Sequence, residues 1–237
     1  NDPVATARAY LEFSRGFNTG MIANWFTQEN YYNQDLNEAS ATVRFALPNG
    51  GYWERLIDRP SRFGKMKARF KPMYSAQGHW WCPPTVDLAT VKELWIVEGI
   101  FDAISLAHND IAAVSAMSSN AYPSHALEQL AELRKGNLPK LVWALDNEPT
   151  ARAYLQRWAK QSQALGFKSV AALIPQRDGR KVDWNDLHQR WQFEDDEKRD
   201  KRRARDLEIA RHEGDLLLAR SPKDKAMLMY TWEDSTS

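Results

Sequence analysis

The chain has 237 residues, 43% of them hydrophobic, and a formal net charge of +1 at pH 7. This length allows one large domain or two ordinary ones, and the hydrophobic fraction is sufficient for a folded core. No window approaches the roughly 18 consecutive apolar residues of a membrane span, and the first residues lack the basic start and apolar stretch of a secretion signal. We therefore expect a soluble, cytoplasmic protein without a membrane partner.

The residue inventory argues against metal sites built on sulfur or imidazole. Cys82 is the one cysteine of the chain, so it cannot form an internal disulfide or by itself build a thiolate zinc site. The five histidines show no ligand spacing such as H-x-x-x-H. A zinc enzyme is therefore not expected, and Cys82 is interpreted as a small, half-buried hydrophobic residue.

The patterns of the first part of the chain, residues 1–88, indicate a small mixed α+β subdomain. Helical spacing of apolar residues predicts one short helix around residues 10–13 and a second at 21–26, separated by a turn at 15–16. Farther along, apolar and polar residues alternate on both sides of Asn49-Gly50, which predicts a β-hairpin with its turn at that dipeptide.

A local basic patch follows the predicted hairpin. Between Glu54 and Lys71 there are seven basic residues against two acidic ones, with aromatic residues interleaved. The basic residues are Arg55, Arg59, Arg62, Lys65, Lys67, Arg69 and Lys71. Such a mixture suits single-stranded nucleic acid, because the charges meet phosphates and the rings stack on bases. The alternative is a basic surface hairpin whose aromatic residues turn into the core.

From residue 92 the pattern changes to alternating buried strands and amphipathic helices. Strands are predicted at 93–97, 111–117, 141–145 and 168–175, and helices at 101–109, 125–135 with Ser124 as N-cap, and 149–165 with Pro149 at the first position. This alternation predicts a mostly parallel sheet with helices on both faces, and sites in such sheets lie beyond the carboxyl ends of the strands. Residues 194–213 carry eight acidic and seven basic side chains, which favours a solvated helix over a nucleic-acid arm.

Carboxylates follow the predicted strands at three places. Glu98 comes directly after the first strand, Asp146 and Glu148 after the third, and Asp183 and Asp186 after a loop beyond the fourth. We expect them to converge at one edge of the sheet, where carboxylates without a cation would repel one another. Hard oxygen ligands suit Mg²⁺ or Mn²⁺, and two such ions can activate one oxygen and stabilise another. The chemistry indicated is phosphoryl or nucleotidyl transfer, or phosphodiester hydrolysis.

Each acidic segment alone also has a purely structural interpretation. Glu98 could be a cap or a surface residue, the segment 146–149 is good chemistry for a helix N-terminus, and the segment 183–186 could cap a short helix. The occurrence of all three in strand-helix order favours a metal site over capping alone.

The segments "VEGIFDAISL", "WALDNEPTARAY" and "KVDWNDL" resemble the three motifs of the Toprim domain, which primases, topoisomerases and some nucleases share, and the primase branch fits best. More weakly, "ARAYLEFSRGF" is similar to the Y-L-x-x-R-G helix of the primase core. The resemblance implies an α/β fold with a Toprim-type parallel sheet and flanking helices at 89–193. A mixed basic subdomain at 1–88 would precede it, and a charged helical segment at 194–237 would follow.

By this resemblance the chain is a DNA-dependent primase core that makes short RNA primers on single-stranded DNA by two-metal nucleotidyl transfer. Its substrates would be nucleoside triphosphates, its cofactor Mg²⁺ or Mn²⁺, its setting plasmid or phage replication, and a replicative helicase is a candidate partner. The implied catalytic residues are Glu98, Asp146 and Glu148; Asp146, Glu148, Asp183 and Asp186 would hold metal; and Gly99, Asp102 and Lys181 would support the site. Gly99 is expected to supply a permissive backbone. Lys181 could meet phosphate, and the alternative is a plain surface lysine.

Three departures from the primase pattern leave other functions open. Glu148 replaces the second Asp of the family's Asp-x-Asp pair, Pro149-Thr150 replaces the glycine that often follows it, and the chain lacks an amino-terminal zinc-binding module. A Toprim nuclease could use the same carboxylates for hydrolysis. A non-catalytic module that binds nucleic acid or a replication partner is a further alternative, whereas a topoisomerase would need large additional domains.

Overall fold

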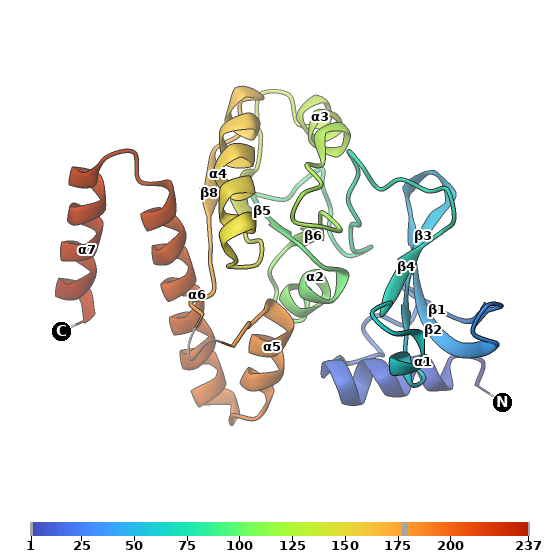
Figure 1. Cartoon of the computed structure of the whole chain (residues 1–237). Helices are drawn as coiled ribbons and strands as arrows, with labels where there is room; N and C mark the ends of the chain where they lie inside the picture. The colour runs from blue at the N-terminus through green and yellow to red at the C-terminus, as the bar shows by residue number, and fades with distance from the viewer. Residues whose placement is uncertain (1, 177–179, 237) are drawn as a thin grey trace.

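The computed structural model describes residues 2–176 and 180–236 and contains two four-stranded sheets (Figure 1). The first is antiparallel, in the order β1-β2-β3-β4, with β1 Thr27–Asn33, β2 Glu38–Leu47, β3 Gly51–Leu56 and β4 Ala68–Phe70. The second is parallel, in the order β6-β5-β7-β8, with β5 Glu93–Val97, β6 Ala113–Ser115, β7 Lys140–Trp143 and β8 Ser169–Ala171. None of the described helices is long and apolar enough to cross a membrane.

The helices lie around and after the parallel sheet, except for one at the beginning of the chain. Helix α1 Ala5–Ala9 continues into a π-helical turn, Tyr10–Ser14; α2 Ile100–Ala107, α3 Ser124–Leu133, α4 Pro149–Ala164 and α5 Trp184–Gln192 flank the sheet; and α6 Asp196–Leu218 and α7 Pro222–Thr236 follow. Short 3₁₀ turns occur at Pro48–Gly50 and Pro60–Phe63.

The first sheet confirms the predicted hairpin and adds a strand that the sequence did not indicate. Asn49 and Gly50 have φ angles of 58° and 69°, the left-handed conformation that a tight hairpin turn requires. Strand β1 is the polar segment TQENYYN, which lacks an apolar alternation and forms because β2 pairs with it along its whole length. The predicted helix at 21–26 is wrong, because single turns occupy that segment.

The parallel sheet is confirmed, with helices on both faces. Along β5, Trp95 and Val97 belong to one core cluster and Leu94 and Ile96 to the other, as the two-residue period of a strand requires. Helices α2 and α5 cover the first face, and α3 and α4 cover the second. Helix α3 begins at Ser124 with Pro123 as its N-cap, so the prediction of Ser124 as N-cap was wrong by one residue.

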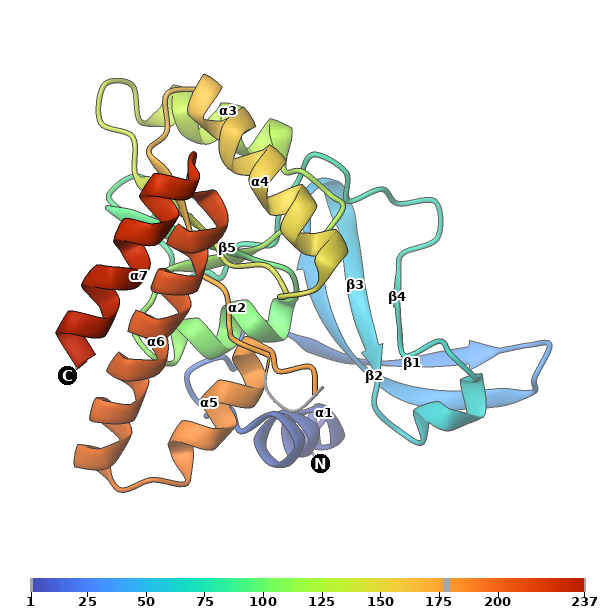
Figure 2. The same ribbon diagram turned by 60° about the vertical axis from the view of Figure 1, so that its left-hand side comes forward.

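The antiparallel sheet packs directly on helix α2 of the parallel domain. The Phe101 ring lies 5.5 Å from that of Trp53 and 6.1 Å from that of Phe45, both edge-on. These rings belong to a single apolar cluster that extends from α1 to α5. Burial of aromatic rings in this geometry is strongly stabilising, so the first sheet has a fixed position beside α2 (Figure 2).

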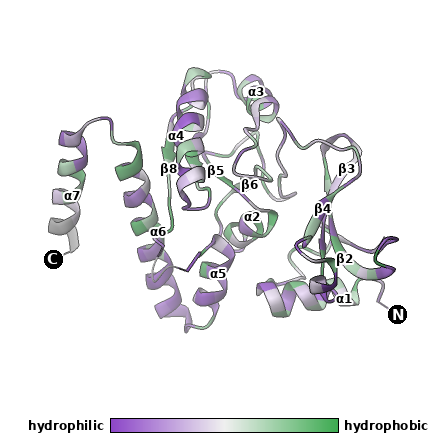
Figure 3. Ribbon diagram, viewed as in Figure 1, coloured by the Kyte–Doolittle hydropathy of each residue, from purple (hydrophilic) through white to green (hydrophobic). Residues whose placement is uncertain are grey.

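The charged segment after α5 is confirmed as a helix, α6, and most of its residues are hydrophilic (Figure 3). It is nevertheless attached to the sheet, because Ala210 and Gly214 of α6 are buried and the Ala210 carbonyl accepts a hydrogen bond from the Leu173 amide at 2.8 Å. A Cβ atom at Gly214 would lie 2.1 Å from the Ala171 carbonyl oxygen. Helix α7 packs on α6 at the outside of the molecule (Figures 1 and 2).

We expect Gly214→Ala to lower the free energy of unfolding by about 1–3 kcal/mol, because α6 must move away from β8. The sign is informative, since the same replacement in an exposed helix raises stability by about 1 kcal/mol. Urea denaturation of wild type, Gly214→Ala and the neighbouring control Glu213→Ala measures the effect. A stabilised Gly214→Ala variant would contradict the close packing of α6 on β8.

Candidate active site

The three acidic segments meet at the carboxyl edge of the parallel sheet. Glu98 follows β5 directly, Asp146 and Glu148 follow β7, and Asp183 immediately precedes α5. The start of α5 is held against β7 because the buried Trp184 indole donates to the Ala144 carbonyl at 2.9 Å. This anchor brings a segment that is distant in sequence to the place where β7 ends.

Lys181 occupies the centre of this charge arrangement. Its ammonium lies 2.7 Å from the Asp146 carboxylate and 3.0 Å from that of Glu148. Burial acts against the charge of Lys181, but its hydrogen bonds to these two carboxylates outweigh that effect, so the pKa of Lys181 is raised. Lys181, interpreted from the sequence as a phosphate contact or a plain surface lysine, is therefore the cation that pairs the two acids after β7.

Glu98 is held as a partly buried carboxyl group. The Ser119 amide donates a hydrogen bond to its carboxylate, and the Ser115 hydroxyl donates to its backbone carbonyl at 2.9 Å. Burial, reinforced by the negative charges of Asp146 and Glu148, raises the pKa of Glu98 to about 7, against the opposing effect of Lys181. Glu98 is thus poised to exchange a proton near neutral pH.

Asp102 is buried between α2 and α5, and its two oxygens accept hydrogen bonds from the amides of Gly99 and Asn185, at 3.2 Å and 3.3 Å. Burial and the nearby charges of Asp183 and Asp146 raise the pKa of Asp102 well above its usual range. Asp102 therefore links the segment that follows β5 to the start of α5 through hydrogen bonds.

The reason predicted for Gly99 was wrong. Its φ angle of −103° is one that any residue adopts, so a permissive backbone is not required. Glycine fits here because an added Cβ would lie 2.9 Å from an oxygen of Asp102. The residue is needed for the close approach of that carboxylate.

Asp183 and Asp186 form a capping box at the start of α5. The Asp186 amide donates to Asp183 Oδ1 at 2.8 Å, and the Asp183 amide donates to Asp186 Oδ2 at 3.1 Å, so the structural interpretation of this segment is confirmed. Burial raises the pKa of Asp183, as do the charges of Asp186 and Asp146. Glu148, in contrast, occupies the N-cap position of α4 without a cap hydrogen bond, and its side chain turns to Lys181.

Arg15 is a site residue that the motif analysis did not single out. Its guanidinium lies 4.5 Å from the centre of the Phe101 ring and donates to the Asn185 side chain at 3.3 Å, and its charge lowers the pKa of Asp183. The segment "ARAYLEFSRGF" contained the signal, because its Arg15-Gly16 pair is similar to the end of the primase motif, one residue later than the motif spacing.

The donor set fits a hard divalent cation, although it is not assembled as a ligand shell. In the part of the chain that the structure describes, no group of three or more His, Cys, Asp or Glu side chains is arranged to hold a metal ion. Glu98, Asp146 and Glu148 nevertheless present only carboxylate oxygens, and repulsion from the other two adds to burial in raising the pKa of Glu98, even with Lys181 present. Oxygen donors with excess negative charge are the chemistry that Mg²⁺ and Mn²⁺ select.

The predicted basic patch divides into two groups. Arg62 pairs with Glu38 at 2.8 Å and Asp58 at 3.1 Å, and Arg69 lies 3.6 Å from the buried Glu54, so these two arginines stabilise the first sheet. Arg55 is half-buried. The exposed members are Arg59, Lys65, Lys67 and Lys71, and the Lys71 ammonium also donates to the Gly50 carbonyl at 2.9 Å.

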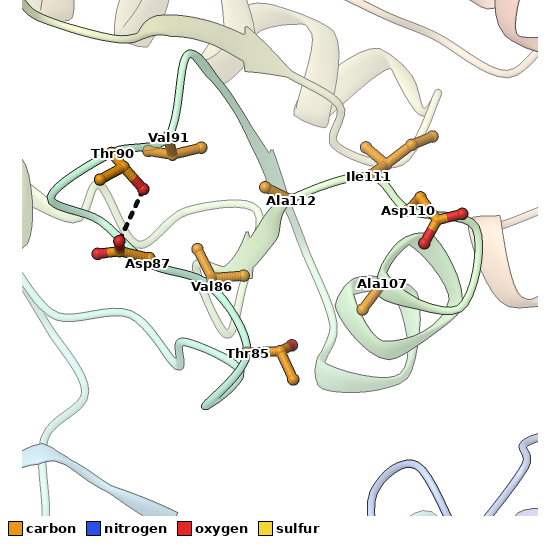
Figure 4. A pocket seen from close by; sticks show the side chains of 9 residues that line it. All are labelled: Thr85, Val86, Asp87, Thr90, Val91, Ala107, Asp110, Ile111 and Ala112. Carbon is orange, nitrogen blue, oxygen red and sulfur yellow. Dashed lines mark hydrogen bonds between the residues drawn. The ribbon is translucent and has the colours of Figure 1, made fainter.

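A pocket of about 380 Å³ lies away from this site (Figure 4). It is lined by the segment before β5, including Asp87 and Thr90, and by Ala107 and Asp110 at the end of α2. The Thr90 hydroxyl donates to the Asp87 carboxylate at 2.7 Å. Because these residues precede β5 and β6, the pocket is at the amino edge of the sheet, opposite Glu98.

Comparison with known proteins defines the class to which this fold and site correspond. The family model described as Toprim-like matches residues 95–188, which include all three acidic segments. This match confirms the resemblance inferred from the motifs for that part of the chain. Comparison with the curated proteins finds no match.

Solved structures with a similar fold include primase domains. The RNA polymerase domain of Mycobacterium tuberculosis primase DnaG is 14% identical, with a TM-score of 0.60 over 99% of this chain and 92% of that chain. The same domain in complex with a double-stranded DNA oligomer with a 6-nucleotide overhang gives 16% identity and a TM-score of 0.62 over 98% and 84%. The primase fragment of the bacteriophage T7 primase-helicase protein gives 13% and 0.50 over 82% and 72%. The chain thus has the Toprim primase fold.

We expect Glu98→Gln to be more stable than wild type by about 1–2 kcal/mol at pH 8 in metal-free buffer, and equally stable near pH 4. The folded-state pKa of Glu98, about 7, lies above its ordinary value of 4.5, so the folded protein retains a proton that the unfolded chain releases. Wild-type stability from this group therefore falls as pH rises from about 4.5 to 7. Urea denaturation across this pH range measures the stability difference between Glu98→Gln and wild type, with the exposed Glu132→Gln as control. A difference that does not change with pH would contradict the raised pKa of Glu98.

Proposed function

We propose that this chain is the catalytic core of a DNA-dependent primase, which joins ribonucleotides on a single-stranded DNA template. The observation that carries the proposal is Glu98, with its pKa near 7, beside the Asp146 and Glu148 carboxylates at the carboxyl edge of a Toprim-like sheet. A general base works best when its pKa is close to the working pH. The primase fold of the solved relatives supports the same reaction class.

In the proposed reaction, the 3′ hydroxyl of one nucleotide attacks the α-phosphorus of a nucleoside triphosphate. Glu98 accepts the hydroxyl proton as the new oxygen–phosphorus bond forms, and the bond to pyrophosphate breaks. The Ser119 amide and the Ser115 hydroxyl hold Glu98 in place for this transfer. Its partial burial keeps the carboxylate weakly solvated, which increases its basicity.

Asp146 and Glu148 are the residues that would hold Mg²⁺ or Mn²⁺, with Asp183 and Asp186 adjoining them. When bound, the metal would neutralise phosphate charge and make the attacking hydroxyl more acidic. Lys181 now satisfies Asp146 and Glu148, and the same ammonium can pair with triphosphate oxygens. The exposed cations at 59, 65, 67 and 71 would contact the template.

A template-directed incorporation assay tests this function. With single-stranded DNA, ribonucleotides and Mg²⁺ or Mn²⁺, wild type is expected to make short RNA products, and Glu98→Gln and Asp146→Asn to lose at least about 100-fold in rate, the size of a typical general-base contribution. The exposed carboxylate variant Glu132→Gln serves as the control and should retain wild-type activity.

Different outcomes of this assay separate the alternatives. DNA or RNA cleavage without added nucleotides, lost in the same two variants, would indicate a Toprim nuclease. Absence of synthesis with both metals, together with no metal binding by calorimetry, would indicate a non-catalytic module. Either result would overturn the primase proposal.

The exposed lysines are expected to contribute salt-dependent DNA binding. Replacing Lys65 and Lys67 with alanine removes about two phosphate contacts, so the slope of log K against log salt should weaken by about 1.4 for a single strand. Fluorescence anisotropy with a labelled oligonucleotide measures this slope. The matched control replaces Lys198 and Lys201, two exposed lysines of α6, and an equal effect there would show nonspecific attraction.

A further inference from the structure

A pocket of about 580 Å³ lies between the first sheet and the carboxyl edge of the parallel sheet. Its lining includes Phe70 at the end of β4, Gln77 from the segment that joins the sheets, and Met117, Ser118, Asn120 and Tyr122 from the loop after β6. This volume is within the range of about 300–1,000 Å³ typical of ligand pockets. We call it the neutral pocket.

The neutral pocket adjoins the proposed catalytic base. Ser118, which lines it, precedes Ser119, whose amide donates to Glu98. One loop therefore forms a wall of the pocket and also positions the Glu98 carboxylate. A ligand that reaches from the pocket to the acidic site would pass along this loop.

The chemistry of the lining favours an uncharged, planar, hydrogen-bonding group. No Lys, Arg, Asp or Glu side chain is among the lining residues, so phosphate finds no counter-charge there. Gln77 is exposed, and its side-chain amide makes no hydrogen bond within the described residues. Phe70 and Tyr122 supply aromatic rings and Asn120 a second amide, which are the groups that stack on nucleobases and bond to their edges.

The loop itself adopts an unfavourable conformation at the pocket. Met117 has a φ of 70°, which is uncommon for a residue with a side chain and is typically retained where function requires it. The Ser115 hydroxyl holds this turn, because it accepts a hydrogen bond from the Met117 amide at 3.1 Å while donating to the Glu98 carbonyl. The shape of the pocket wall and the position of Glu98 are thus set by one serine.

We propose that the neutral pocket receives the base of a nucleoside triphosphate whose phosphates lie at the Glu98–Asp146 site. This inference rests on the proposed function for the phosphate position. Phe70 stacks on the base, and Gln77 and Asn120 bond to its edge. Gln77 is the residue that discriminates between bases, because its amide is free to pair.

Binding of nonhydrolysable triphosphate analogues of the four ribonucleosides, measured by calorimetry with Mn²⁺, tests the pocket without catalysis. Gln77→Ala is expected to lose about fivefold in affinity for at least one base and to change the order among the four, as loss of one hydrogen bond predicts. Phe70→Leu is expected to lose about fivefold or more for all four, because stacking on the ring is removed. Inorganic triphosphate, which has no base, should bind wild type and both variants equally.

The matched controls are Gln129→Ala, an exposed glutamine of α3, and Phe193→Leu, an exposed aromatic residue after α5, and both should bind every analogue as wild type does. Unchanged analogue affinity in Gln77→Ala and Phe70→Leu overturns the proposal, as does an equal loss for inorganic triphosphate. If these two variants lose affinity for single-stranded DNA and not for the analogues, the proposal is overturned too, since the pocket would then hold a template base. Base-dependent analogue binding by a wild type that makes no primers supports the pocket and rejects the primase reaction.

Discussion

Electrostatic repulsion at the carboxyl edge of the parallel sheet is the constraint on which the site depends. Burial raises the pKa of Glu98, Asp102 and Asp183, and the charge of Asp146 adds to this effect at each of them. The first and third acidic segments therefore converge on the second. Such a concentration of acids is costly without a cation, and Lys181 supplies one. The fold tolerates this cost because large apolar contacts hold the segments, above all the Trp184 indole against β7. Packing holds these carboxylates together although they repel one another, and a bound cation would relieve that repulsion.

The parallel half of the fold could be predicted because its local signals agree with its tertiary structure. Each predicted strand and helix from residue 93 to 171 has a counterpart, since buried strands and amphipathic helices have distinct periods. The antiparallel half was predicted in part. Its hairpin has a turn dipeptide that requires left-handed backbone, whereas β1 is polar and acquires its structure from pairing with β2. The apolar residues at 21–26 are spaced as in a helix but fold as turns. Ile22 and Phe26 are both buried in the core that the two sheets share, so burial, and not helical periodicity, accounts for their spacing.

The site could be predicted as a set of acids but not as a network. Sequence order placed Glu98, Asp146 and Glu148 after strands, and parallel topology brought them together. It could not show that Asp183 and Asp186 bond to each other's amides, because a capping box and a metal ligand use the same residue types. Nor could it assign Lys181 to Asp146 and Glu148, since a lysine in a loop gives no indication of its partner.

Only some of the basic side chains of the first sheet are exposed to solvent, so only these can contact a ligand. Glu54 is buried and attracts Arg44 and Arg69, and leaving it unpaired would cost several kcal/mol, about 3–5 for a buried pair. The free cations therefore lie outside this buried cluster, while the side toward β6 is neutral and lined by Phe70. A template backbone that follows the exposed lysines and the base of a nucleoside triphosphate in the neutral pocket would therefore contact different chemistry. This division is what a surface needs to hold phosphates and bases at separate places.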